Sequence, residues 1–508
     1  MATSTATPVR ASTSSNLTSQ RVVQVVFVAL VLDLLAFTMP LPLFPRIIDD
    51  FMQREALDPS STPTLLSQTL STVRSLRSYL LSFTNSSPSL STNSRFDLTL
   101  LGGLLGSTFS FCQFVISPFL GTLSDKYGRK KVLMGSMVGN LVSAALWLSS
   151  GDSFGVYALS RIVGGLSEGN VQLSIAAISD VTTRAERSKS LALVGIAFSL
   201  AFTLGPSIGA YFASTDLFHL TSSPVLSIPV LGDVKLNSFA VPAAITLGLL
   251  TIETGYLALC LPETKGWKKV EDADVSEKVG GAKKERKRCS LEERQERLRK
   301  LEWIHFGFLF FFSGAEFTIT FLTNNLFDFS NAQNGRLLGF IGILSSLLQG
   351  GYVRKASSNP SKTFSLAFSG IRACQFSLLL LATLPSLSER HKGDSSKAPM
   401  AILYLAAAGL AFVSATVVTS LNSLASLETD EGGARGDGIE KGKALGKFRS
   451  KGQLGRALGP LFATGLYWCI SPGVAYACCA VGTMLVAKRM GGLRERQEGE
   501  ETGKGKTE

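Results

Sequence analysis

The sequence is poor in charged residues for its length. Only 17% of its 508 residues are Asp, Glu, Lys or Arg, whereas soluble domains usually carry about 25%. Hydrophobic residues make up 45% of the chain. This shortage of charge indicates a lipid environment before any single segment is considered.

Residues that usually carry chemistry are also scarce. The chain has three histidines, and its seven cysteines show no metal-ligand spacing with any of them. All the cysteines but Cys289 lie in or at the edge of apolar runs, where cysteine is typically a small packing residue. The sequence also lacks a glycine-rich lysine loop for nucleotides and a nucleophile constellation. We therefore expect no metal, no cofactor and no disulfide framework, and we expect neither a primary pump nor a membrane enzyme.

Lysine and arginine outnumber the acidic residues, 50 against 38. A surplus of this kind can indicate a nucleic-acid partner, but its placement matters more than its sum. Most of it falls in short segments between apolar runs, and thirteen of the basic residues lie within residues 262–300. We read these charges as setting membrane topology and expect no nucleic-acid partner.

A glycine-punctuated basic stretch, residues 121–131, separates two long apolar runs. The runs, Leu98–Leu120 and Val132–Ser149, are each long enough to cross the ~30 Å hydrocarbon layer as a helix. A short basic loop is expected on the cytoplasmic side of a membrane. The sequence therefore predicts a cytoplasmic connection between two membrane spans.

Four residues of that stretch are candidates for a conformational gate. Gly121 and Gly128 suit a tight reversal, because glycine adopts positive φ without penalty. Asp125 and Arg129 could lock the ends of neighbouring helices together. The alternative is a generic basic loop of another polytopic protein.

Further apolar runs bring the predicted count to twelve spans in two groups of six. The runs cover residues 22–45, 98–120, 132–150, 154–180, 189–213, 238–261, 302–323, 335–353, 363–384, 399–427, 452–471 and 473–488. Punctuation of the first half reappears weakly in the second, at residues 350–355 and 455–460. Basic residues follow the even-numbered spans, including Lys441 to Arg449 after the tenth. The fold class we expect is an all-α polytopic membrane protein with two six-helix pseudo-repeats and both termini in the cytoplasm.

The remaining segments complete the predicted organisation. Disordered cytoplasmic tails (1–20 and 489–508) flank the two halves (21–261 and 301–488), which a basic central loop (262–300) joins. Inside the first half, residues 46–97 form a long non-cytoplasmic loop, with a glycosylation sequon at Asn85 and leucines at helical spacing between residues 66 and 80. In the central loop, Ser290 and Glu293 form a capping box that opens a helix. The basic residues there indicate anionic-lipid binding, a brace between the halves or a solvated linker, of which we favour the linker.

Five polar residues within predicted spans are candidates for the solute pathway or for proton coupling: Asp33, Arg161, Glu168, Gln172 and Glu316. Such residues are costly in a membrane and usually face a cavity or a partner. The spacing of the three in the fourth span puts them on one helical face. The alternative for each is a buried ion pair that only holds helices together. We expect Glu253 nearer to lipid, and we expect the phenylalanines around Glu316 to be packing residues.

At this point the chain resembles a known family. Gly-x-Leu-x-Asp-x-x-Gly-Arg-Lys-Lys (121–131) is similar to the loop signature between spans two and three of the major facilitator superfamily. Arg161-x-x-x-Gly165, and Gly205-Pro206-x-x-Gly209 preceded by glycine, are similar to the fourth-span and fifth-span signatures of its twelve-span drug:proton antiporters. Stretches 312–317, 349–354 and 456–460 resemble the eukaryotic tetracycline-transporter-like group, which includes a carrier associated with organic anions and drugs. Residues 46–97 and 265–300 depart from the family pattern.

The resemblance implies a secondary transporter that works by alternating access. Its solute would be a small organic molecule, drug-like or anionic, exchanged for protons by a monomer in the plasma membrane or an endomembrane such as the vacuole. Gly205, Pro206 and Gly209 would form its antiporter helix, and Glu168 would be the main proton-coupling group, with Asp33 next. The alternative from another class is a membrane sensor or scaffold that keeps the fold without transporting anything.

Overall fold

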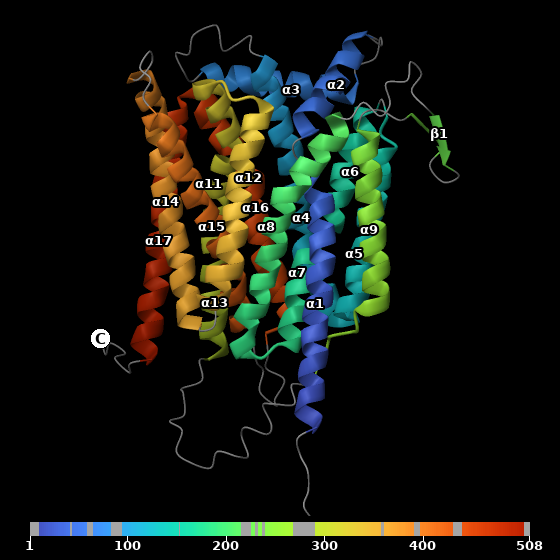
Figure 1. Ribbon diagram of the computed structural model, residues 1–508, viewed down its shortest axis with the longest axis vertical. Helices are drawn as coiled ribbons and strands as arrows, with labels where there is room; N and C mark the ends of the chain where they lie inside the picture. Colours follow the sequence, from blue (N-terminus) through green and yellow to red (C-terminus); the bar gives the residue numbers. More distant parts are fainter. Residues whose placement is uncertain are drawn as a thin grey trace, which may run out of the picture.

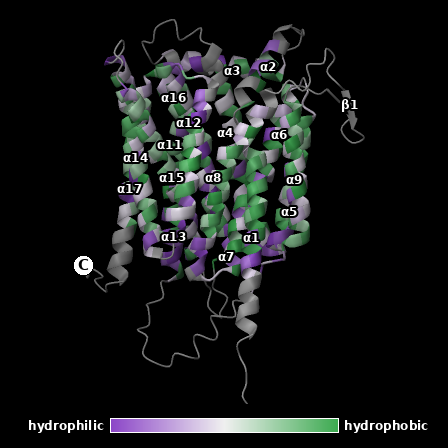
Figure 2. Cartoon of the chain, viewed as in Figure 1, coloured by the Kyte–Doolittle hydropathy of each residue, from purple (hydrophilic) through white to green (hydrophobic). Residues whose placement is uncertain are grey.

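The chain folds into a bundle of long, nearly parallel helices (Figure 1). The structure, a computed structural model, describes residues 10–40, 43–57, 64–82, 94–151, 153–214, 225–228, 232–235, 239–267, 290–356, 360–390, 397–429 and 439–501. Nine helices among these residues are long and apolar enough to cross a membrane. Hydrophobic residues form a broad band across the bundle, and hydrophilic residues gather at its ends (Figure 2).

The first part of the chain supplies the helices α1 (Arg10–Thr38), α2 (Phe44–Leu57), α3 (Leu65–Ser82), α4 (Ser94–Tyr127), α5 (Arg129–Leu148), α6 (Phe154–Ser167), α7 (Asn170–Val181), α8 (Arg184–Ser214) and α9 (Ala240–Cys260). Between α8 and α9, strands β1 (Val225–Ile228) and β2 (Gly232–Lys235) form an antiparallel hairpin in which Val225 pairs with Lys235. We call α1 to α9 the N-terminal group.

The second part supplies α11 (Leu291–Phe327), α12 (Asn331–Leu347), a π-helical turn η3 (Leu348–Val353), α13 (Arg354–Ala356), α14 (Pro360–Arg390), α15 (Ala398–Glu428), α16 (Lys441–Cys469) and α17 (Pro472–Glu501). We call these the C-terminal group. The two groups meet where α4 packs along α16, and where α8 packs against α12 and α15. Helix α1 begins, and α17 ends, at the end of the bundle where α5 starts (the lower end in Figure 1), which we call the Gly128 end.

The connection between α4 and α5 is tighter than predicted. Residues 121–127 are helical, so the predicted reversal at Gly121 is wrong. Gly128 alone makes the reversal, with φ +105°, a conformation that side chains with a Cβ rarely adopt. Gly121 instead lies directly against α16. A Cβ at this position would overlap the backbone carbonyl of Gly442, so only glycine allows this close approach.

The fourth predicted span is broken in the middle rather than continuous. Helix α6 ends at Ser167, Glu168 has extended backbone (φ −74°, ψ 91°), and α7 begins at Asn170. Ser136 satisfies the freed backbone groups, since its hydroxyl donates to the Ser167 carbonyl and accepts from the Gly169 N–H. Such a break is tolerated at membrane depth only where other protein groups take up these hydrogen bonds.

Three predicted boundaries also change. The first span ends at Thr38, because Pro40 disfavours helical backbone at the residue before it. Both predicted tails are partly helical, since α1 begins at Arg10 and α17 extends to Glu501; residues 1–9 and 502–508 lie outside the described residues. The helix between residues 66 and 80 is confirmed as α3, which buries Leu66, Leu70 and Val73 at the end opposite Gly128, whereas Asn85 lies outside the described residues.

The predicted helix at the end of the central loop is confirmed as well. Ser290 caps α11: its hydroxyl accepts from Glu293 N (3.2 Å), and the Glu293 carboxylate accepts from Ser290 N (2.8 Å). Helix α11 then runs without interruption into the seventh predicted span. Residues 268–289 lie outside the described part of the chain.

Candidate functional site

Asp125 joins the two groups of helices at the Gly128 end. Its carboxylate accepts hydrogen bonds from the backbone N–H groups of Gly442 (2.9 Å) and Lys443 (2.7 Å), in the first turn of α16. The first N–H groups of a helix have no partner within it, and a negative charge there is favourable. The first turn of α16 makes no side-chain cap of its own through Glu440. Asp125 therefore caps a helix of the opposite group.

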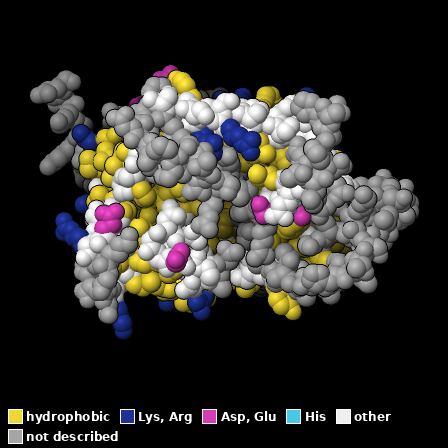
Figure 3. Space-filling model, turned by 90° about the horizontal axis from the view of Figure 1, so that it is seen from above, with side chains coloured by type: hydrophobic (Ala, Val, Ile, Leu, Met, Phe, Trp, Pro, Cys, Tyr) yellow, Lys and Arg dark blue, Asp and Glu magenta, His cyan; other side chains and the backbone are white. Residues whose placement is uncertain are grey.

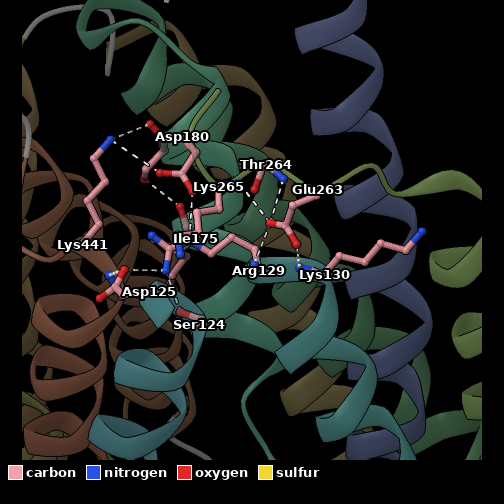
Figure 4. A network of polar contacts seen from close by, with 12 residues as sticks. Ser124, Asp125, Arg129, Lys130, Ile175, Asp180, Glu263, Thr264, Lys265 and Lys441 are labelled. Carbon is pink, nitrogen blue, oxygen red and sulfur yellow. Dashed lines mark hydrogen bonds and ion pairs between the residues drawn. The ribbon is translucent and has the colours of Figure 1, made fainter. Parts of the chain in front are cut away.

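Arg129 fixes Asp125 in place and extends the network (Figure 4). Its guanidinium is 2.7 Å from Asp125 Oδ1, 2.6 Å from Ser124 Oγ and 2.9 Å from Asp180 Oδ2. Asp180, at the end of α7, also pairs with Lys441 Nζ at 3.6 Å. The arrangement links α4, α5, α7 and α16 through buried or partly buried charges, and its hydrogen bonds are charge-assisted. The expectation that Asp125 and Arg129 lie at adjoining helix ends agrees with this geometry.

Glu263 is a member of this network that the sequence reasoning missed. It lies just after α9, and its carboxylate accepts from the backbone N–H groups of Arg129 (2.7 Å) and Lys130 (3.2 Å), at the start of α5. Gly128 makes room for it, because a Cβ at that position would overlap the Glu263 carboxylate. Lys265 adds a bond from its Nζ to the carbonyl of Lys126 (2.8 Å). Glu263 thus caps α5 and ties the end of α9 to the α4–α5 connection.

A second line of hydrogen bonds closes the same end between α7, α8 and α15. Ser179 and Ser426 lie 2.7 Å apart through their hydroxyls, as do Ser188 and Ser423 at 2.6 Å. Arg187 is fully buried and donates to the carbonyl of Ser426 at 3.2 Å. These bonds all join the N-terminal group to the C-terminal group. The Gly128 end is therefore sealed by polar contacts as well as by packing.

Deeper in the bundle, Asp33 and Glu168 line a small cavity of about 50 Å³ together with Asn140 and Arg161. Asp33 is 2% exposed, and its Oδ1 accepts from Asn170 Nδ2 at 2.7 Å. Its second oxygen is buried without a hydrogen-bond partner among the described residues. Glu168 accepts from Asn140 Nδ2 at 3.2 Å. Two of the predicted residues thus meet at the break between α6 and α7.

Arg161 lines this cavity too, but it does not pair with Glu168 as expected. Among the described residues no ion pair joins the two. The guanidinium lies instead over the rings of Trp147 (5.6 Å) and Tyr157 (5.7 Å). Cation–π contact of this kind compensates a buried cation without neutralising a neighbouring acid. Both side chains line the same cavity, so the contacts of the guanidinium with the two rings, and not a different helical face, account for the missing ion pair.

Gln172 also departs from its predicted position. On α7 it donates from Nε2 to the carbonyl of Ser117 at 3.0 Å, so it braces α7 against α4 and does not line the cavity. The prediction that it shares one helical face with Arg161 and Glu168 is wrong, because the break between α6 and α7 lies before Gln172.

Arg449 faces the acids from the C-terminal group, where the sequence analysis had placed it in a loop. It lies on α16, where its positive charge acts on both Asp33 and Glu168, although among the described residues no ion pair joins it to either acid. With the Gln453 amide turned so that its oxygen faces Arg449, this oxygen accepts from Nε and Nη2 of Arg449, both at 3.0 Å, and the amide nitrogen donates to Gln113 on α4. A missed signal was available: Arg449 precedes Gln453 and Arg456 at helical spacing, four and seven residues on.

Of two further acids singled out from the sequence, only Glu253 is buried. Glu253 on α9 is 1% exposed, and its Oε2 is buried without a hydrogen-bond partner among the described residues, so the expectation of a lipid-facing position is wrong. Its charged neighbours include Asp33 and Glu168. Glu316 on α11 is exposed and interacts with Arg456 rather than lining the small cavity. The phenylalanines near it behave as packing residues, of which Phe308 and Phe312 stack at 5.2 Å.

The glycines of the fifth predicted span bring α8 against α1. A Cβ at Gly205 would overlap the Thr38 side chain, and one at Gly209 would overlap the backbone of Met39. Thr38 donates from its hydroxyl to the carbonyl of Ala201 at 2.9 Å, which strengthens the contact. Pro206 lies inside a continuous α8, so this stretch serves close helix approach without breaking the helix.

The opposite end of the bundle has a different character. Viewed onto that end (Figure 3), the described charged side chains are scattered singly between apolar side chains, with large areas that are not described. Helices α2 and α3 pack on α4 there, and α3 also contacts α16. The dense polar network described above belongs to the Gly128 end.

Comparison with known proteins agrees with this architecture. The family model of the Major Facilitator Superfamily matches residues 26–460. The mouse protein called major facilitator superfamily domain-containing protein 10 is 33% identical over 466 residues, which cover 91% of this chain and 90% of the relative. Its human counterpart is 31% identical over 461 residues, covering 88% of each.

A more distant relative and a solved structure point the same way. Quinolone resistance protein NorA of Staphylococcus aureus is 36% identical over 124 residues, which are 24% of this chain and 32% of NorA. The crystal structure of the human organic anion transporter MFSD10 (TETRAN) is similar to this structure with a TM-score of 0.67 and 29% identity, covering 93% of this chain and 99% of that one. The chain therefore belongs to the Major Facilitator Superfamily, as a multi-pass membrane transporter and not an enzyme.

Proposed function

We propose that this transporter moves a small organic solute, drug-like or anionic, and couples the movement to protons by alternating access. Two relatives support the solute class, because one is an organic anion transporter and the other a quinolone resistance protein. The first of them is matched over nearly the whole of this chain.

The observation that carries the proposal is the small buried cavity that Asp33, Glu168 and Arg161 line together. Asp33 and Glu168 come from the N-terminal group and Arg449 from the C-terminal group. Charges at this depth are costly and usually serve transport, and carboxylates need no further cofactor to carry protons. Glu168 is our main candidate for the coupling group, because it sits at the break between α6 and α7 with a single hydrogen-bond partner among the described residues, Asn140. Asp33, which has one unpartnered oxygen, is the second.

The charge of the solute decides the direction of coupling. A drug-like solute that binds to the ionised carboxylates must dissociate when the carboxylates are protonated. This gives exchange of solute for protons. An organic anion would instead bind to the guanidinium of Arg449. Protonation of the two acids would leave this guanidinium available to the anion. Solute and proton would then move together. Exchange is our first proposal, and co-transport of an anion is the second, which the position of Arg449 favours.

The sealed Gly128 end gives the state in which the carrier is seen. We propose that this end faces the cytoplasm. The α4–α5 connection carries Lys126, Lys130 and Lys131, and short loops rich in Lys and Arg are typically retained on the cytoplasmic side of a membrane. The structure would then represent an outward-facing state held by Asp125 and Arg129. Both tails would be cytoplasmic, and α6 with α7 would count as one of twelve spans in two groups of six. A monomer is sufficient for this cycle.

A non-transporting scaffold is the less favoured function. A scaffold needs neither a helix cap supplied across the two groups nor acids buried beside a cavity without an ion-pair partner among the described residues. The elaborated Asp125 network supports a carrier that alternates between states.

Proteoliposomes with an imposed pH gradient test the proposal. A panel of organic anions and cationic drugs is offered to vesicles with an acidic or an alkaline lumen. Exchange concentrates the solute in acidic vesicles, whereas co-transport with protons concentrates it in alkaline ones. Equal solute uptake under both gradients would remove the proton-coupling proposal, and absence of uptake for the whole panel would favour the scaffold.

Glu168→Gln then identifies the coupling group, because it keeps the shape and removes the charge. Gradient-driven accumulation should vanish, while solute exchange between compartments of equal pH survives. Asp328→Asn is the matched control, because Asp328 is an exposed acid whose left-handed backbone (φ 55°) asparagine tolerates. If accumulation in Glu168→Gln still follows the pH gradient, Asp33 becomes the better candidate.

A further inference from the structure

A groove at the Gly128 end, between α11 and α17, plays no part in the function described so far. It is a cavity of about 550 Å³, much larger than the one beside Asp33. Its lining includes Arg299, Lys300, Trp303, Ile304, Arg489 and Leu493.

Helical spacing explains why these residues face one another. On α11, Arg299 and Lys300 precede Trp303 by four and three residues, which places all three on one side of the helix. On α17, Arg489 and Leu493 are four residues apart. Gly492 lies between them, and a Cβ there would have no atom within 4 Å, so the groove has room beside the α17 backbone.

The groove is basic at its rim and apolar at its base. Arg299 and Arg489 are exposed, while Ile304 and Leu493 are buried. Among the described residues, Glu296 is the acid that lines the groove, and it forms an ion pair with Lys300 one helical turn away. The two arginines therefore leave an excess of positive charge.

Trp303 marks the level at which polar surroundings give way to apolar ones. Its ring is 45% exposed, and Lys451 Nζ lies 4.5 Å from the ring centre. Tryptophan prefers the interface between headgroups and hydrocarbon. The residues of α11 before Trp303 are mostly charged, whereas the residues after it form the apolar span.

We propose that this groove binds an anionic phospholipid from the surrounding membrane. Arg299 and Arg489 hold the phosphate and the headgroup charge, while an acyl chain lies along Trp303, Ile304 and Leu493. Guanidinium groups suit phosphate oxygens in geometry and charge, and anionic lipids are enriched in the cytoplasmic leaflet. The bound lipid bridges the ends of α11 and α17. The site is independent of proton coupling and of the solute.

Fluorescence quenching of Trp303 by brominated phospholipids tests this directly in the full-length protein. Nanodiscs of phosphatidylcholine carry a small fraction of brominated phosphatidylserine or brominated phosphatidylcholine, and Trp303→Phe identifies the signal of this tryptophan. Wild-type protein should be quenched preferentially by the serine lipid. Loss of two surface cations, each contributing about 1 kcal/mol to anionic-lipid attraction, should weaken this preference roughly thirtyfold in Arg299→Gln/Arg489→Gln.

Lys488→Gln is the matched control, because Lys488 is an exposed cation next to Arg489 that does not line the groove. It should keep the wild-type preference. The proposal is overturned if the double variant keeps the preference, or if Lys488→Gln loses it equally. It is also overturned if soluble glycerophosphoserine displaces the lipid at the same concentration from wild-type and double-variant protein, since specific recognition by the two arginines would then be missing.

Discussion

Replacing Asp125 by Asn should shift the carrier away from the state in which the Gly128 end is sealed. The carboxylate holds two backbone N–H groups of α16 and the Arg129 guanidinium. An amide oxygen can keep one of the two N–H groups, but the second meets the NH₂ group, which cannot accept. A hydrogen bond to a charged group contributes about 1.5–3 kcal/mol. We therefore expect a loss of about 2 kcal/mol, or roughly thirtyfold in the equilibrium between sealed and open states.

Cysteine labelling measures this shift. Ser450 is a suitable reporter, because it is 5% exposed and its hydroxyl donates to the carbonyl of Phe114 on α4, across the contact between the groups. In a background without native cysteines, Ser450→Cys should react slowly with a polar thiol reagent. Adding Asp125→Asn should accelerate labelling by roughly the same factor and reduce the transport rate. Membrane insertion should be unchanged, since acids contribute little to topology.

Glu440→Gln provides the matched control at the same helix end. Glu440 forms an ion pair with Lys443 of the same chain segment at 3.1 Å, and both side chains are about half exposed. Such a surface pair contributes little to stability, so labelling and transport should stay near wild type. Wild-type labelling together with wild-type transport in Asp125→Asn would refute the reasoning.

Three further predictions concern neighbouring parts of the chain. Glu263→Gln weakens the cap on α5 by about 1 kcal/mol, and should raise labelling of the same reporter about fivefold; unchanged labelling would mean that this cap is independent of the seal. Gly121→Ala should open the seal and slow transport, because its Cβ would overlap the Gly442 carbonyl, whereas Gly135→Ala on α5 meets open space and should behave as wild type; equal transport by the two variants would count against a contact role for Gly121. Deletion of Val275–Arg288, outside the described residues, should preserve transport in reconstituted vesicles, and loss of solute binding in an inserted deletion variant would place this segment in the pathway.

Local patterns in the sequence were sufficient for much of the fold. Apolar runs predicted the long helices, and the four-residue signature at Ser290 predicted the cap of α11, because these features depend on residues close in the chain. Asp125 and Arg129 were recognisable as residues at helix ends for the same reason. Their partners were not, since Asp125 and Gly442 are 317 residues apart and no spacing encodes that contact.

The residues that were misplaced share a physical cause. Hydropathy does not reveal where an apolar segment stops being helical, and the break at Glu168 depends on Ser136, a residue far away in the sequence that bonds to the backbone of Ser167 and Gly169. Charge counting placed Arg449 in a loop, because a basic residue near an apolar run usually marks its end. Glu253 was placed toward lipid because nothing in its neighbourhood along the chain shows which face of α9 is covered.

Because Asp125 of α4 caps α16, the first turn of α16 depends on contact between the two groups of helices. During synthesis, the amides of Gly442 and Lys443 emerge long after the carboxylate that will accept from them, so α16 can complete its first turn only once it docks on α4. In the working carrier the same turn must lose its acceptor, hydrate and re-form with every opening of the Gly128 end. Folding and transport thus share one local step, the docking of this turn on α4. The rate of hydrogen exchange at these two amides should therefore depend on how often the Gly128 end opens.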